Sequence, residues 1–138
     1  MAILGFPLLI IPIAIYNIFA FLIQADPSDW LKPLFTIHMM SGADWTVSAG
    51  ELLIALALVL LFFEIVKATR HTQRSIIDHM LSTLVFIGAL VEFLLVRQAG
   101  TSIFALLIVI CLVDVVGGYS VSIRSATRDY TVERADTP

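Results

Sequence analysis

Five acidic side chains fall within long apolar stretches of the sequence, where an ionised group is unfavourable: Glu51, Glu64, Asp78, Glu92 and Asp114. Asp114 is the deepest, because it stands near the middle of the apolar stretch 101–124, with no basic residue within one helical turn. An intramembrane carboxyl is by default a candidate site for a proton or a cation. The alternative is a protonated Asp that hydrogen-bonds across a helix interface. The sequence leaves both interpretations open.

Glu64 and Asp78 lie closer to the ends of their apolar stretches and have basic neighbours. Glu64 precedes Lys67 by one helical turn and Asp78 follows Arg74 by one, so each can form an ion pair along a single helix. This pattern is typical of ion pairs at the membrane boundary. If the chain transports an ion, these two carboxyls would instead form a vestibule on the inner side of Asp114.

Glu51 and Glu92 have simpler structural interpretations. The spacing Ser48-x-x-Glu51 matches a capping box, which predicts that a helix begins here. Glu92 stands near the outer end of its stretch, where it can reach water and Arg97. With the three carboxyls above, Glu92 remains a candidate for ion or proton binding.

The composition predicts a membrane protein. Of the 138 residues, 59% are hydrophobic and 14% are charged, whereas a soluble domain has about 25% charged residues. Eight Lys and Arg against eleven Asp and Glu leave no basic surplus for nucleic acid. A spanning helix needs about 20 apolar residues. Four stretches are long enough, and they predict an all-α bundle of four transmembrane helices: 3–24, 48–68, 75–97 and 101–124.

Small and polar residues recur along one side of each expected helix. In the first helix, Pro7 and Pro12 are also expected to kink the inner half. A stripe of small and polar residues on an apolar helix is typical of helix–helix interfaces in membranes. We therefore expect the stripes to meet inside the bundle, with these residues at the contacts: Asn17, Gly50, Ala57, Ser82, Ala89, Cys111, Gly117 and Gly118.

The distribution of Lys and Arg predicts the orientation, because cytoplasmic segments carry an excess of both. Only Lys32 and Arg97 would lie on the outer side if the chain crosses four times. Both termini and the polar tail 125–138 are thus expected in the cytoplasm, with a bacterial inner membrane the expected location. The inner side would carry six basic residues: Lys67, Arg70, Arg74, Arg124, Arg128 and Arg134.

The outer loop, residues 25–47, is expected to contain a short interfacial helix. Asp26 can cap this helix, and Pro33 would break it. Trp30 and Trp45 would anchor the loop at the level of the lipid headgroups. A docking surface for another membrane subunit is the alternative. His38 and the two Met that follow it are soft metal ligands, but the loop offers no further His or Cys, so no metal is expected.

No catalytic constellation is evident, and no cofactor is expected. Ser82 follows His79 by three residues, but a single pair of this kind is common by chance. We therefore expect a non-catalytic membrane subunit or scaffold, whose partners are lipid and either copies of itself or other membrane subunits. The alternative is a proton- or cation-linked channel or transporter that uses Asp114.

Overall fold

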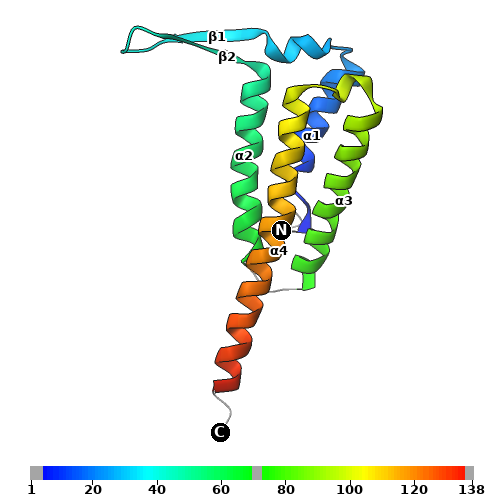
Figure 1. The fold of residues 1–138 in the computed structure, drawn as a ribbon, viewed down its shortest axis with the longest axis vertical. Coiled ribbons are helices and arrows are strands. Elements are labelled where there is room, and N and C mark those ends of the chain that lie inside the picture. Colours follow the sequence, from blue (N-terminus) through cyan, green and yellow to red (C-terminus); the bar gives the residue numbers. More distant parts are fainter. Residues whose placement is uncertain (1–4, 70–72, 136–138) are drawn as a thin grey trace.

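The computed structural model of the chain describes residues 5–69 and 73–135, without the side chains of 73–75, 122 and 125–135. It is 74% helical (Figure 1). Three long helices dominate: α2 (Ala49–Ala68), α3 (Gln73–Leu95) and α4 (Ser102–Ala135). Each contains a 20-residue apolar segment that is long enough to cross a membrane. Helices long and apolar enough to span a membrane are thus confirmed for these three stretches.

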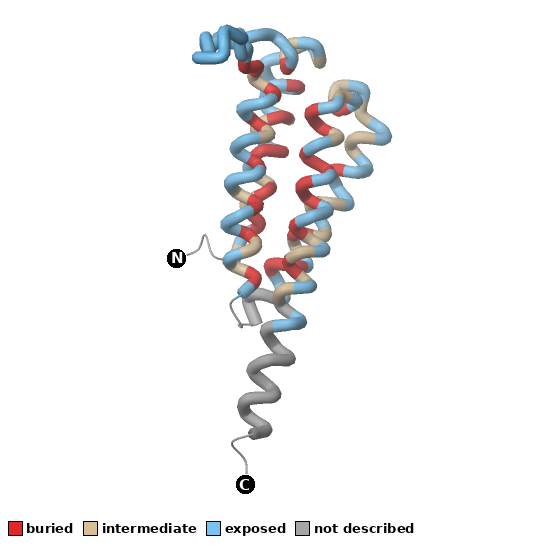
Figure 2. Tube along the Cα trace, turned by 60° about the vertical axis from the view of Figure 1, so that its left-hand side comes forward, coloured by how far each residue is buried: buried red, intermediate tan, exposed pale blue. Residues whose placement is uncertain are grey.

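Helix α4 lies between α2 and α3 and packs against both (Figure 1). Within its apolar segment, 44% of the residues are buried, against 28% in α2 and 22% in α3. The end of the bundle from which α4 projects is called the tail end below, and the opposite end is called the hairpin end. Buried residues line the sides on which the helices face one another (Figure 2).

The first apolar stretch forms a shorter helix than expected. Helix α1 spans Ile10–Asn17 and continues as a wider π-helical turn, η2 (Ile18–Leu22). Residues 6–9 are not helical, so the expected kinks at Pro7 and Pro12 do not occur in a long helix. Pro12 falls in the first turn of α1, where its missing N–H is not needed.

Side-chain caps begin the helices where the sequence predicts them. At the start of α2, the Ser48 hydroxyl accepts from the Glu51 N–H at 3.3 Å, and the Glu51 carboxylate accepts from the Ser48 N–H at 2.7 Å, which confirms the capping box. At the start of α4, the Thr101 hydroxyl accepts from the Phe104 N–H at 3.1 Å. These bonds satisfy donors that helix geometry leaves unpaired.

The outer loop differs from the expectation of one interfacial helix broken at Pro33. Asp26 caps only a short 3₁₀ helix, η3 (Pro27–Leu31). An antiparallel hairpin of β1 (Pro33–His38) and β2 (Asp44–Ser48) follows it. Gly42 allows the tight turn, since its φ of +87° is one that other residues rarely adopt. The hairpin extends across the direction of the helices, away from the bundle (Figure 1).

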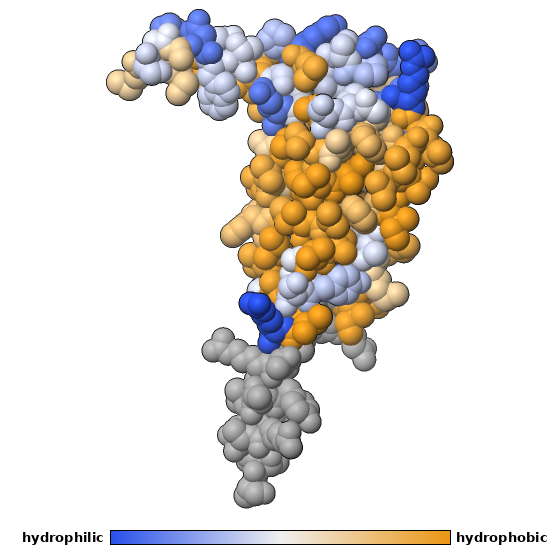
Figure 3. Space-filling model, in the orientation of Figure 1, coloured by the Kyte–Doolittle hydropathy of each residue, from blue (hydrophilic) through white to orange (hydrophobic). Residues whose placement is uncertain are grey.

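A belt of apolar residues covers the helical bundle. Figure 3 shows this belt between the polar hairpin end and a more polar patch toward the tail end. Inside the bundle, the fully buried side chains Tyr16, Leu107 and Phe104 form the centre of the core. A short 3₁₀ turn, η4 (Arg97–Ala99), connects α3 to α4 at the hairpin end.

Candidate functional site: a buried cluster around Lys67

Four charged side chains from three helices meet inside the bundle near its tail end. Glu64 and Lys67 come from the last turns of α2, Asp78 from the start of α3, and Asp114 from the middle of α4. The three carboxylic residues are 3–4% exposed, which places them within the protein and away from lipid. This set of Glu64, Lys67, Asp78 and Asp114 is called the Lys67 cluster below.

The Lys67 ammonium is the centre of the cluster. It lies 3.3 Å from Glu64 Oε1 and 3.0 Å from Asp78 Oδ2, and it donates to the carbonyl oxygen of Phe6 at 2.9 Å. An ammonium group has three donors, so these contacts use all of them. The ion pair expected between Glu64 and Lys67 is confirmed. The expected partner of Asp78, Arg74, has a side chain outside the described residues.

Glu64 also connects the cluster to the start of α1. Its Oε1 accepts a hydrogen bond from the backbone N–H of Leu8, just before the helix begins at Ile10. A carboxylate is favourable at this position, because the first N–H groups of a helix are unpaired and carry partial positive charge. Glu64 and Lys67 together fix the segment from Phe6 to Leu8 against α2.

Asp114 faces the other carboxyls across the bundle. It lies within electrostatic range of Glu64, Asp78 and Lys67, and its carboxyl lies beside the Ser82 hydroxyl of α3. Asp78 Oδ1 and Ser82 Oγ are both buried without a hydrogen bond of good geometry in the described part of the chain. The prediction that Asp114 turns toward other helices and not toward lipid is confirmed by its 3% exposure.

The cluster holds more acidic than basic groups. Three carboxyls share one ammonium, so full ionisation would leave two unbalanced negative charges in a buried site. Unpaired buried charge is strongly unfavourable. The arrangement can therefore hold one or more protons between its carboxyl oxygens. The sequence placed Glu64 and Asp78 near Asp114 only in the transport alternative, and it did not predict the contact of Lys67 with Asp78, because these two residues come from different helices.

A second group of side chains lies beside the cluster and was not expected to meet. His79 packs on Gly118 so closely that a Cβ at residue 118 would lie 2.8 Å from His79 Cε1. The rings of His79 and Tyr119 are 5.3 Å apart, and the Tyr119 and Thr83 hydroxyls are 3.3 Å apart. Ser82 makes no described hydrogen bond to His79. The geometry thus adds no support to a Ser–His catalytic pair.

Glu92 lies near the hairpin end, away from the Lys67 cluster. Its carboxylate accepts from Asn17 Nδ2 of α1 at 3.1 Å, and no ion pair with the exposed Arg97 occurs among the described residues. Sequence reasoning missed Tyr16, whose hydroxyl donates to the Gln98 carbonyl at 2.7 Å. Both contacts fasten α1 to the region where α3 turns into α4.

The expected packing residues separate into two groups. Ala57, Ala89 and Cys111 are buried in the core, as is Gly50, where an added Cβ would lie 2.6 Å from Ile103 Cδ1. By contrast, a Cβ at Gly117 would meet no described atom within 4 Å. The expected packing role of Gly117 inside the bundle therefore has no partner among the described residues.

The two tryptophans differ in environment. Trp30 is 6% exposed and stacks on Tyr16 with ring centroids 4.8 Å apart, so its expected role as an anchor in lipid is replaced by a role in the core. Trp45 is 53% exposed on the hairpin. Its role as an interface anchor is taken up below.

The described residues contain no group of three or more His, Cys, Asp and Glu suited to a metal ion. On the hairpin, His38 pairs with Asp44. Comparison with protein-family models, curated proteins and solved structures gives no match.

Proposed function

We propose that the chain is a non-catalytic integral membrane subunit that associates with copies of itself or with other membrane proteins. One observation carries this proposal: the spanning helices bury few of their residues within the chain, 28% in α2 and 22% in α3. The unburied faces are mostly Leu, Ile, Val and Phe, and they form the apolar belt of Figure 3. Apolar faces of this kind can contact either lipid chains or the helices of a neighbouring chain.

The proposal includes four crossings of a bacterial inner membrane. Helix α1 with η2 would provide the first crossing, completed by the segment before Ile10. The tail end would lie in the cytoplasm, since Lys67 and Arg124 are near it, whereas Lys32 and Arg97 are at the hairpin end. Arg70 lies outside the described residues, and the side chains of Arg74, Arg128 and Arg134 are likewise not described.

The subunit proposal can be tested by gentle extraction. The tagged chain, expressed at its native level, would be purified in a mild detergent and analysed by size and by mass spectrometry. We expect a species larger than one chain, either an oligomer or a complex with another membrane protein. Cross-linking in intact membranes before extraction controls for dissociation by detergent. A single chain in both experiments would contradict the proposal.

The Lys67 cluster favours a second candidate function, proton-linked transport. In this role Asp114 would bind the proton, and Glu64 and Asp78 would lie between it and the tail end. The supporting observation is the excess of carboxyls over ammonium groups in a buried site between three helices.

The variant Asp114→Asn separates the two functions. The amide has nearly the same shape and can still hydrogen-bond, but it cannot ionise. In proteoliposomes with an imposed pH gradient, proton-linked transport predicts a proton flux with the original chain. The same function predicts that Asp114→Asn abolishes this flux. If the original chain gives no flux, or if Asp114→Asn leaves the flux unchanged, the transport function is excluded. Association of the chains should survive in both cases.

A further inference from the structure

The two faces of the hairpin differ sharply in polarity. The register pairs Phe35 with Val47 and Ile37 with Trp45. Side chains of directly paired residues share a face of the hairpin, and successive residues alternate between faces. One face is thus apolar and aromatic. The intervening residues put Thr and a His–Asp pair on the opposite face: Thr36, His38, Asp44 and Thr46.

The apolar face is exposed in the chain. Trp45 is 53% exposed, Phe35 is 46% and Ile37 is 42%. Nothing else in the described chain packs over the outer half of the hairpin (Figure 1). An isolated two-stranded hairpin is at best marginally stable in water. An exposed aromatic face on such a hairpin therefore requires an apolar surface against it.

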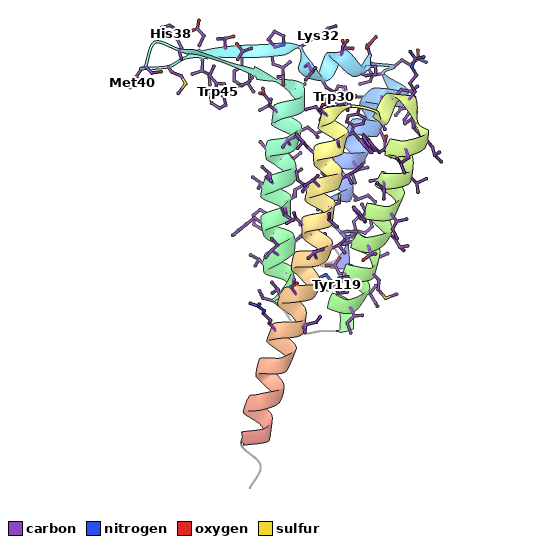
Figure 4. All side chains as sticks on the ribbon, viewed as in Figure 1. Trp30, Lys32, His38, Met40, Trp45 and Tyr119 are labelled. Carbon is purple, nitrogen blue, oxygen red and sulfur yellow. The ribbon has the colours of Figure 1, made fainter. Side chains whose placement is uncertain are left out.

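The position of the hairpin identifies that surface. The hairpin extends sideways at the edge of the apolar belt, across the direction of the spanning helices (Figures 1 and 3). Its side chains divide between the two sides: Trp45 and Met40 point toward the side on which the belt lies, whereas His38 points the other way (Figure 4). A bilayer that surrounds the belt would end at this level.

The base of the hairpin is continuous with an apolar groove in the bundle. This groove has a volume of about 480 Å³ and is lined by residues of α1, η2, β1 and α2, among them Phe19, Leu34, Leu52 and Leu56. It lies in the part of the belt nearest the hairpin. Leu34 is the residue of β1 that lines the groove, so the groove lies at the base of the hairpin, separate from the face formed by Phe35, Ile37 and Trp45.

We infer that the hairpin lies flat on the bilayer, with Phe35, Ile37 and Trp45 at the boundary between lipid headgroups and acyl chains. The hairpin contains no Lys, Arg or Glu, and its His38 and Asp44 pair with each other on the opposite face. The contact therefore depends on apolar burial and on the preference of Trp for this boundary, and it does not require anionic lipid. The inference needs the membrane location of the helices, but not the subunit role proposed above.

Trp45 reports on this contact directly. The chain has two tryptophans, so Trp30→Phe leaves Trp45 as the only one. This variant would be reconstituted in phosphatidylcholine vesicles that carry bromine at shallow or deep acyl positions. We expect blue-shifted emission, stronger quenching by shallow than by deep bromines, and little quenching by acrylamide. If Trp30→Phe does not fold, the emission of Trp45 can be obtained instead as the difference between the spectra of the original chain and of Trp45→Phe.

Two controls assign the contact to lipid. Ile37→Lys on the apolar face should reduce quenching by bromine, whereas Thr36→Lys on the polar face should not. Dilution to one chain per vesicle should leave the quenching intact. The inference is overturned if bromine does not quench Trp45: quenching by acrylamide would then mean that water covers the face, and quenching by neither would mean that a protein covers it. Bromine quenching that appears only on dilution would overturn it in favour of a second copy that covers the face at higher density.

Discussion

At the residue scale, one ammonium group connects three parts of the chain. Lys67 of α2 binds Asp78 of α3 and the Phe6 carbonyl before α1, and its own carboxylate neighbour Glu64 binds the Leu8 N–H. These groups have lost most of their contact with water. Their interactions must therefore compensate for desolvation. Substitution of any one partner leaves another buried charge unpaired and should destabilise the fold.

Replacement of Lys67 by Met should destabilise the bundle severely. Removing one partner of a buried ion pair leaves an uncompensated charge and typically costs about 3–5 kcal/mol. Unfolding in mixed detergent and SDS micelles would measure the change. Lys32→Met is the matched control, because this side chain is 71% exposed and should have little effect. Equal stabilities of the two variants would contradict a central role of Lys67. The double variant Lys67→Met with Asp78→Asn should recover part of the stability lost in Lys67→Met.

Adjacent glycines in α4 offer a second residue-scale test. Gly118→Ala places a methyl group against the His79 ring and should destabilise by about 1–3 kcal/mol, the usual effect of overpacking. Gly117→Ala has open space in the described chain and should stabilise the helix by up to about 1 kcal/mol. Thermal unfolding of both variants in detergent would show the contrast. Similar shifts in both would indicate that the His79–Gly118 contact is unimportant.

Single-sequence reasoning found the members of the Lys67 cluster but not their convergence. The Glu64–Lys67 pair was predictable, since both residues lie one turn apart on one helix. The pairing of Lys67 with Asp78 depends on how α2 and α3 pack, which helical spacing does not encode. The same reason explains why Glu92 binds Asn17 of α1 and not the nearby Arg97.

At the element scale, the starts of the three long helices were predicted closely, whereas the first helix begins at Ile10 and not at residue 3. The expected stretches 48–68, 75–97 and 101–124 compare with helices over Ala49–Ala68, Gln73–Leu95 and Ser102–Ala135. The hairpin was missed because the outer loop was interpreted with helical spacing. Gly42, between two segments that alternate in polarity, was the available signal for a turn.

The capping box of α2 should contribute measurably. Ser48→Ala removes the hydroxyl that accepts from the Glu51 N–H and should cost about 1 kcal/mol. Ser48→Thr keeps this acceptor and should retain most of the stability. Unfolding in the same mixed micelles measures both variants. The role of the cap would be refuted by equal stability of Ser48→Ala and the original chain.

The short helix η3 should respond to acid. Hydrogen bonds from Lys32 and from the Asp26 N–H hold the pKa of Asp29 below its usual range. Because the pKa of Asp29 is lower in the folded chain than in the unfolded chain, its ionised carboxyl stabilises the fold at pH values above the ordinary pKa of Asp. This stability is lost as the pH falls through the lowered pKa. We expect the near-UV signal of Trp30 to weaken at acidic pH. Asp29→Asn should remove this acid step, and an unchanged step would assign it to another group.

At the scale of the whole molecule, the chain combines an apolar exterior with a polar interior. The apolar belt covers the face shown in Figure 3, over a bundle that holds the Lys67 cluster near the tail end and the Asn17–Glu92 contact near the hairpin end. Contacts at both ends fasten the short helix α1 to the three long helices. This arrangement is the physical basis for treating α1 with η2 as the first of four crossings.

The sidedness of the two termini tests this account most directly. Reporters fused to the N-terminus and to the C-terminus, active only in the cytoplasm or only outside it, would locate each end in living cells. Four crossings place both termini on the same side, which we expect to be the cytoplasm, with a reporter in the turn of the hairpin on the other side. Termini on opposite sides would mean an odd number of crossings and would contradict the four-helix membrane bundle.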